Sequence, residues 1–196
     1  MALPLAANQH RLLPSHAMLL LYATHDGQAR RIATRIAARL ADCGFEATPR
    51  DLADGAPTGA EIGAAPLVVL VAAVRYGRHL PQAERFLATY RRASPQSPLA
   101  FISVNLTARK PGKNNATHNA YLRKSIRRHG LVPVLAQAVA GRLAYPHYRW
   151  WDRQIIRLIM TLTGGPADPR TCTEFTDWAE VDAIATRIVA LLDGIH

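Results

Sequence analysis

Residues 18–40 read MLLLYATHDGQARRIATRIAARL, and the order of their side chains predicts a strand, a turn and a helix. Met18 to Ala23 form a short apolar run of the length of a buried strand. Ile32, Ile36 and Leu40 then recur at the spacing of one helix face. The first backbone N–H groups of such a helix lack intrahelical partners, and the helix dipole adds positive potential there. We therefore predict an anion site, suited to a phosphate, in the turn.

The turn comprises Thr24, His25, Asp26, Gly27 and Gln28. The hydroxyl of Thr24 is a hydrogen-bond donor, Asp26 is predicted to cap the helix, and Gly27 permits a positive φ or a close approach of the backbone. The turn has neither the Gly-Lys-Ser/Thr of a P-loop nor the three glycines of a dinucleotide-binding fingerprint. An ordinary strand-to-helix turn with a cap is the alternative interpretation.

Four further strands are predicted, at residues 45–51, 67–73, 99–105 and 133–140, with helical segments between them. This alternation predicts an α/β fold with a doubly wound, five-stranded parallel sheet. Ligands of such sheets bind beyond the carboxyl ends of the strands. The turn at 24–28 and the loops at 74–79 and 105–110 should therefore converge on one site. The predicted helices include one over residues 115–129 and one over 176–192.

The net charge of +10 is unevenly distributed, because no Asp or Glu occurs between Arg85 and Trp151. A positive half-molecule favours anionic partners such as acidic lipid, nucleic acid or a polycarboxylate, although an ordinary basic surface would look the same. Cys43 and Cys172 lack metal-ligand spacing, so neither a metal site nor a disulfide framework is expected. Residues 1–17 are interpreted as a loose tail rather than a secretory signal, and 18–196 as one domain.

Residues 141–173 form an insertion before the last predicted helix. Within it, residues 149–162 can form a helix with Arg149, Arg153 and Arg157 on one stripe and an apolar face opposite. Such a helix suits a membrane surface, but packing against its own domain is an equal alternative. Nearby aromatic side chains, including Tyr148 and Trp150, would also suit a flat anionic ligand.

The turn at 24–28 resembles the phosphate loop of flavodoxin-like proteins. Several longer stretches closely resemble the bacterial menaquinone-dependent protoporphyrinogen IX dehydrogenase family: YATHDGQARRIA, VRYGRHLP, FISVNLTARKPGK and AGRLAYPHYRWWDRQIIRLIM. The resemblance extends from Met18 to the last residue. Ala29 departs from the family, which commonly has Thr at this position, and this departure weakens one phosphate contact without removing the site.

This resemblance implies a flavodoxin-like fold, non-covalent FMN, protoporphyrinogen IX as substrate, and menaquinone or ubiquinone as electron acceptor. Residues 24–28 would bind the phosphate, and two loops would flank the flavin ring: Val74, Arg75 and Tyr76, then Asn105, Leu106, Thr107, Ala108 and Arg109. The substrate would meet Arg109, Lys110, Tyr148, Arg149, Trp150 and Arg153.

A peripheral position on the cytoplasmic side of the inner membrane is expected, and a homo-oligomer is compatible with the sequence. No catalytic base is assigned, since His79 and His147 fit surface or structural roles. The alternative function is an NAD(P)H-dependent flavodoxin-like quinone reductase. A nucleic-acid-binding module ranks last, because no segment matches a known nucleic-acid reader, and no nucleic acid is expected as a partner.

Overall fold

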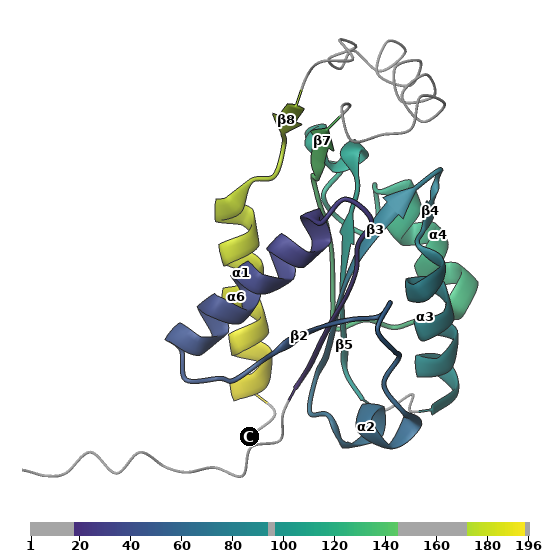
Figure 1. Cartoon of the computed structure of the whole chain (residues 1–196), viewed down its shortest axis with the longest axis vertical. Helices are drawn as coiled ribbons and strands as arrows, with labels where there is room; N and C mark the ends of the chain where they lie inside the picture. The colour runs from purple at the N-terminus through teal and green to yellow at the C-terminus, as the bar shows by residue number, and fades with distance from the viewer. Residues whose placement is uncertain (1–17, 94–96, 145–171, 195–196) are drawn as a thin grey trace, which may run out of the picture.

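The computed structural model describes residues 18–93, 97–144 and 172–194. Its central sheet has the strand order β2-β1-β3-β5-β6, and all four pairings along this path are parallel. This order places the first strand inside the sheet and is the doubly wound, flavodoxin-like arrangement. The predicted five-stranded parallel sheet is thus confirmed (Figure 1). The strands are β1 (Leu19–Ala23), β2 (Pro49–Asp51), β3 (Val68–Arg75), β5 (Leu99–Val104) and β6 (Leu135–Val139).

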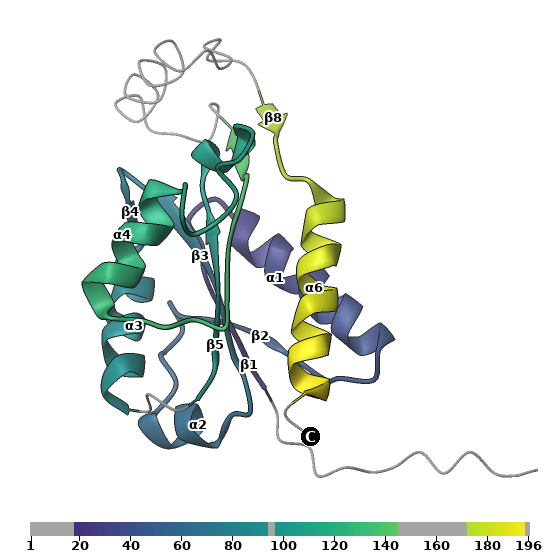
Figure 2. The same ribbon diagram turned by 180° about the vertical axis from the view of Figure 1, so that it is seen from behind.

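Helices cover both faces of the sheet, as Figures 1 and 2 show from opposite sides. One face carries α1 (Gln28–Asp42) and α6 (Trp178–Asp193), and the other carries α2 (Gly59–Ala64), α3 (Pro81–Ala93) and α4 (Ala120–His129). Alternate residues of each central strand enter opposite cores, so Val69 packs toward α1 and Leu70 toward α3. Burial on both faces explains why the strands are continuous apolar runs.

Two elements begin four or more residues later than predicted. The strand expected at 45–51 is limited to Pro49–Asp51, which lies at the edge of the sheet and, within the described residues, pairs with β1 alone. The helix expected at 115–129 begins at Ala120 instead. Asn119 ends the preceding loop there, and its side chain accepts the N–H of Leu122 as an N-cap.

The loop predicted at 74–79 is a β-hairpin. Strand β3 continues through Arg75, and the short strand β4 (Arg78–His79) returns antiparallel to it. Tyr76 and Gly77 form the two-residue turn, with φ of 50° and 77°. Two successive positive φ values are typical of the tight hairpin turns whose twist matches the strands.

The insertion begins and ends with the two strands of a second, smaller sheet. Strands β7 (Arg142–Ala144) and β8 (Cys172–Glu174) pair antiparallel. Figure 1 shows this ribbon at the end of the molecule where the strands of the main sheet terminate. The helix predicted at 149–162 lies outside the described residues. Within the part of the chain that the structure describes, no helix is both long and apolar enough to cross a membrane.

Candidate flavin site at the ends of β1, β3 and β5

The amino end of α1 lacks a side-chain cap. The N-cap is Gly27, with a left-handed φ of 79°, and the first turn of the helix contains no acidic residue. The prediction that Asp26 caps the helix is therefore wrong. A left-handed glycine ends the turn one residue later, and the Asp26 carboxylate instead lies 2.8 Å from Nδ1 of His25. The leading N–H groups of α1 consequently have no carboxylate in competition with an incoming anion.

Thr24, which directly follows β1, has a buried hydroxyl with no hydrogen-bond partner among the described residues. A buried hydroxyl without a partner costs free energy, so such groups are uncommon in folded proteins. The oxygen lies in the same turn as the uncapped helix end. A phosphate bound there would accept a hydrogen bond from this hydroxyl as well as from the backbone, so these residues fit the phosphate of FMN.

Gln28 contributes differently from the other residues of the turn. Its side-chain amide is buried and donates to Oε1 of Glu174 at 2.5 Å and to Oγ1 of Thr176 at 2.8 Å. The backbone N–H of Gln28 is therefore the part of this residue that can serve an anion. The side chain instead joins the turn to the last residue of β8 and to the segment that follows it.

The hairpin after β3 presents an aromatic ring beside this turn. Tyr76 is 63% exposed although it adopts a positive φ, which is rare for an aromatic residue. The guanidinium of Arg75 lies 5.2 Å from the centre of the Tyr76 ring, and its Nη1 is 4.0 Å from Oδ1 of Asp26. Residues held in sparsely populated backbone conformations cluster at active sites and ligand sites.

The segment after β5 is a short 3₁₀-helix, η1 (Leu106–Arg109), whose residues are all half-buried. Asn105 is buried, and its side-chain oxygen accepts the N–H of Ala108, which caps η1. Nη1 of Arg109 donates to the carbonyl of Leu106 at 2.8 Å, and the guanidinium lies 5.8 Å from the centre of the Phe175 ring. Lys110 follows and is exposed.

The three segments converge because β1, β3 and β5 are neighbours in the sheet and point in the same direction. The structure thus brings residues 24–28, 74–76 and 105–110 to one edge, beside the β7–β8 ribbon (Figure 1). Tyr148, Arg149, Trp150 and Arg153, which were expected to meet the substrate, lie outside the described residues. Sequence reasoning missed Glu174, Phe175 and Thr176, because nothing local marks a partner so distant in the chain.

His79 has a structural environment, as predicted. It is buried, and its Nε2 lies 2.8 Å from Oγ of Ser103 on β5. Burial lowers the pKa of His79 to about 4, against the opposing attraction of the Glu84 carboxylate. The ring is therefore neutral at physiological pH. His147, the other histidine considered, lies outside the described residues.

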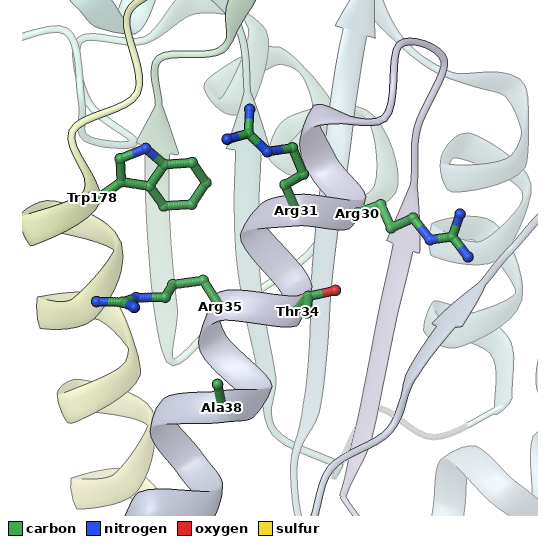
Figure 3. A pocket seen from close by; sticks show the side chains of 6 residues that line it. All are labelled: Arg30, Arg31, Thr34, Arg35, Ala38 and Trp178. Carbon is green, nitrogen blue, oxygen red and sulfur yellow. The ribbon is translucent and has the colours of Figure 1, made fainter.

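An open pocket of about 570 Å³ lies along α1 beside α6 (Figure 3). Figure 3 shows Arg31 and Arg35 directed toward α6, whereas Arg30 points to the other side of α1. The guanidinium of Arg31 lies 5.2 Å from the Trp178 ring, and Arg35 makes two hydrogen bonds of 2.7 Å to Asp182. The pocket includes no residue of the three converging segments and is therefore separate from the candidate site.

Comparison with known proteins agrees with this geometry. The flavodoxin domain family matches residues 19–170. Protoporphyrinogen IX dehydrogenase [quinone] of Escherichia coli K12 is 37% identical over 179 residues, which cover 89% of this chain and 96% of the relative. The protein of the same name from Leishmania major is 38% identical, over 88% of this chain and 74% of its own. The chain belongs to the quinone-dependent protoporphyrinogen IX dehydrogenase family.

Members of the protoporphyrinogen IX dehydrogenase family are oxidoreductases, and the flavodoxin domain agrees with the observed topology. Among solved structures, a flavodoxin from the domain Archaea has a TM-score of 0.54 at 14% identity and covers 90% of this chain and 99% of its own. Rubredoxin oxygen:oxidoreductase from Desulfovibrio gigas has a TM-score of 0.55 at 12% identity, over 93% of this chain and 37% of its own. At these identities the likeness supports the fold alone.

Proposed function

We propose that this protein is an FMN-dependent dehydrogenase that oxidises protoporphyrinogen IX to protoporphyrin IX and delivers the electrons to a respiratory quinone. The family relationship supplies the reaction class. The observation that supports a flavin phosphate at this site is the buried hydroxyl of Thr24, which has no partner in the described part of the chain and lies beside the uncapped end of α1. The same proposal explains why the first turn of α1 contains no acidic residue.

The phosphate of FMN would be held by the backbone N–H groups at the start of α1 and by the Thr24 hydroxyl. His25, Asp26 and Gly27 complete the turn. The left-handed Gly27 leaves room around its Cα, since a Cβ there would meet nothing within 4 Å. Because Ala29 carries no hydroxyl, the phosphate depends more heavily on Thr24 than in relatives with a Thr at that position.

The flavin ring would lie between the hairpin after β3 and the η1 segment. Tyr76 offers an exposed ring for stacking, and Val74 and Arg75 form the strand end below it. On the other side, residues 105–109 form a compact turn held by the Asn105 cap. FMN supplies the redox chemistry when bound: it accepts two electrons from a donor and passes them to an acceptor.

The propionates of the porphyrinogen would be bound by cations near the η1 end of the site. Arg109 and Lys110 lie there, and Arg149 and Arg153 would add to them together with the aromatic Tyr148 and Trp150. The ring of Phe175 lies 5.8 Å from the Arg109 guanidinium and lines this end of the site. Arg109 would contribute its positive charge to the binding of an anionic substrate.

The acceptor quinone, menaquinone or ubiquinone, resides in a bilayer, so the site must approach one. We propose that the domain formed by residues 18–196 docks peripherally on the cytoplasmic side of the inner membrane. The insertion at 141–173 would make the contact through a helix at 149–162, whose cationic stripe and apolar face suit an anionic lipid surface. Residues 1–17 would be a tail outside this domain.

Flavin titration tests the proposed site. Apoprotein should bind FMN and quench its fluorescence, and it should bind riboflavin on the order of 100-fold more weakly, because riboflavin lacks the phosphate that takes several charge-assisted hydrogen bonds. Equal affinities for FMN and riboflavin would contradict the phosphate site. Anaerobic addition of NADPH to the FMN-loaded protein then tests the alternative function. Rapid reduction of the flavin by NADPH would favour a quinone reductase.

A further inference from the structure

Four buried polar side chains form a continuous hydrogen-bonded row beneath the η1 segment. His79 on β4, Ser103 on β5, Asn105 before η1 and Asn119 before α4 are each at most 4% exposed. Nε2 of His79 lies 2.8 Å from Oγ of Ser103, and Nδ2 of Asn105 lies 3.0 Å from the same oxygen. Asn119 in turn donates to Oδ1 of Asn105 at 3.1 Å. The row therefore joins strands β4 and β5 to η1 and to the start of α4.

Two backbone N–H groups fix the orientation of both asparagine side chains in this row. The N–H of Ala108 donates to Oδ1 of Asn105, and the N–H of Leu122 donates to Oδ1 of Asn119. Both amide oxygens are thereby acceptors, so Nδ2 of Asn105 must be the group that donates to Ser103. The Ser103 hydroxyl has one proton, and Nε2 of His79 is its one acceptor among the described residues, so we assign the proton to that hydrogen bond. On this assignment Nε2 is unprotonated.

The remaining ring nitrogen of His79 then carries the proton. Nδ1 lies 3.9 Å from Oε1 of Glu84 on α3. Glu84 is also bound by His129 and Arg128 of α4, each at 3.0 Å. These three groups are the charged or titratable side chains that face His79 in the described part of the chain. Burial keeps the ring neutral, and the Glu84 carboxylate favours Nδ1 as the nitrogen that carries the single proton.

We propose that His79 is a positioning residue of the flavin site, which acts through Ser103 to hold the Asn105 side chain in the orientation that caps η1. Its acceptor nitrogen fixes the Ser103 hydroxyl, the hydroxyl fixes the amide of Asn105, and the amide oxygen holds the N–H of Ala108. The part of this proposal that concerns flavin binding rests on the proposed function, whereas the tautomer and the cap of η1 do not.

The tautomer can be measured directly in the full-length apoprotein. Nitrogen-15 NMR of the histidine rings should show His79 as the neutral species with the proton on Nδ1 at pH 7. Hydrogen exchange of the Ala108 N–H should accelerate in His79→Leu and in Ser103→Ala. The N–H of Leu52, which binds the Tyr22 carbonyl elsewhere in the sheet, serves as an internal reference for general destabilisation. A proton on Nε2, or equal acceleration at both amides, would overturn the proposal.

The effect on the site is tested by FMN titration and by the visible spectrum of the bound flavin. His79→Leu removes the acceptor and should weaken FMN binding about tenfold, as expected for the loss of one hydrogen bond in a buried network. His79→Gln retains an acceptor oxygen and should restore binding to within about threefold of the wild type. His118→Gln, at an exposed histidine, is the matched control and should leave binding unchanged.

The outcomes separate this inference from the proposed function. If wild-type protein binds FMN and His79→Leu, His79→Gln and Ser103→Ala all match its affinity and spectrum, the positioning role is wrong and the flavin site stands. If the wild type binds no FMN, the proposed function is wrong, and the positioning of a flavin fails with it. Should His79→Leu not fold, Ser103→Ala carries the same prediction, because its hydroxyl is the link between His79 and Asn105.

Discussion

The guanidinium of Arg31 lies 2.7 Å from the carboxylate of Glu174, and this ion pair ties the first turn of α1 to strand β8. Gln28 binds the same carboxylate from the start of the helix. The first turn of α1, which borders the candidate phosphate site, is thus bound to strand β8 at the end of the insertion.

Replacement of Glu174 should reveal a pH-dependent contribution to stability. Burial alone would raise the pKa of Glu174, but hydrogen bonds from Arg31, Thr176 and Gln28 outweigh it and hold the pKa below the ordinary value. The stabilisation is therefore present above about pH 4.3, the unfolded value, and is lost as pH falls through the folded pKa. Because the pair is partly exposed, Glu174→Gln should lower the free energy of unfolding by about 0.5–1 kcal/mol at pH 7.

Urea denaturation at a series of pH values measures this effect. The difference between wild type and Glu174→Gln should shrink as the pH falls below about 4, where the wild-type carboxylate takes up its proton. Glu46→Gln, at an exposed position, should change stability by less than about 0.5 kcal/mol at every pH. A difference that stays constant with pH would contradict the ion-pair explanation.

Thr24→Val should affect stability and ligand binding in opposite directions. Valine has nearly the shape of threonine but removes the buried hydroxyl that lacks a partner, so the apoprotein should gain about 1 kcal/mol. The same substitution removes a donor to the phosphate and should weaken FMN binding about tenfold. Thermal unfolding of the apoprotein and FMN titration give the two values. Thr34→Val, farther along α1, should leave FMN binding unchanged, and a Thr24→Val protein with wild-type affinity would argue against the phosphate contact.

Gly27→Ala isolates the conformational role of the glycine in the turn. A Cβ at this position would meet nothing within 4 Å, so crowding cannot explain a loss of stability. The φ of 79° should nevertheless cost about 1 kcal/mol in the apoprotein. Gly63→Ala is the matched control in α2, where space is also open but φ is not positive. It should stabilise the protein by up to about 1 kcal/mol, and equal effects at the two sites would contradict the argument.

Tyr76→Asn should separate backbone strain from ligand stacking. Asparagine tolerates a positive φ better than tyrosine does, so the apoprotein should become more stable by about 0.5–1 kcal/mol. Loss of the exposed ring should weaken flavin binding about tenfold if Tyr76 stacks on the isoalloxazine. Unchanged binding, measured by fluorescence titration, would place the flavin ring elsewhere.

The sequence predicts the strands and helices around this site well, because the residue patterns that identify them are local. The apolar run before Thr24 and the spacing of Ile32, Ile36 and Leu40 identify β1 and the buried face of α1 without tertiary information. Likewise, the five parallel strands follow from the alternation of short apolar runs with helical segments. The convergence of three segments at one edge then follows from the topology of such sheets.

Other features depend on contacts between distant residues, and local patterns do not reveal them. Asp26 is a favourable capping residue by type, but the left-handed Gly27 ends the turn one position later. Arg31 and Glu174 are 143 residues apart, so no local sequence pattern indicates that they form an ion pair. The extension of β3 into a hairpin requires a tyrosine with positive φ, which residue preferences argue against.

The central claim is tested most directly by the two half-reactions of the FMN-loaded protein in the absence of oxygen. Protoporphyrinogen IX should bleach the absorbance of the oxidised flavin while the absorbance of protoporphyrin appears. A quinone added afterwards should restore the flavin absorbance. If the flavin stays oxidised with protoporphyrinogen IX but bleaches with NADPH, the proposed substrate is wrong and the protein is a quinone reductase.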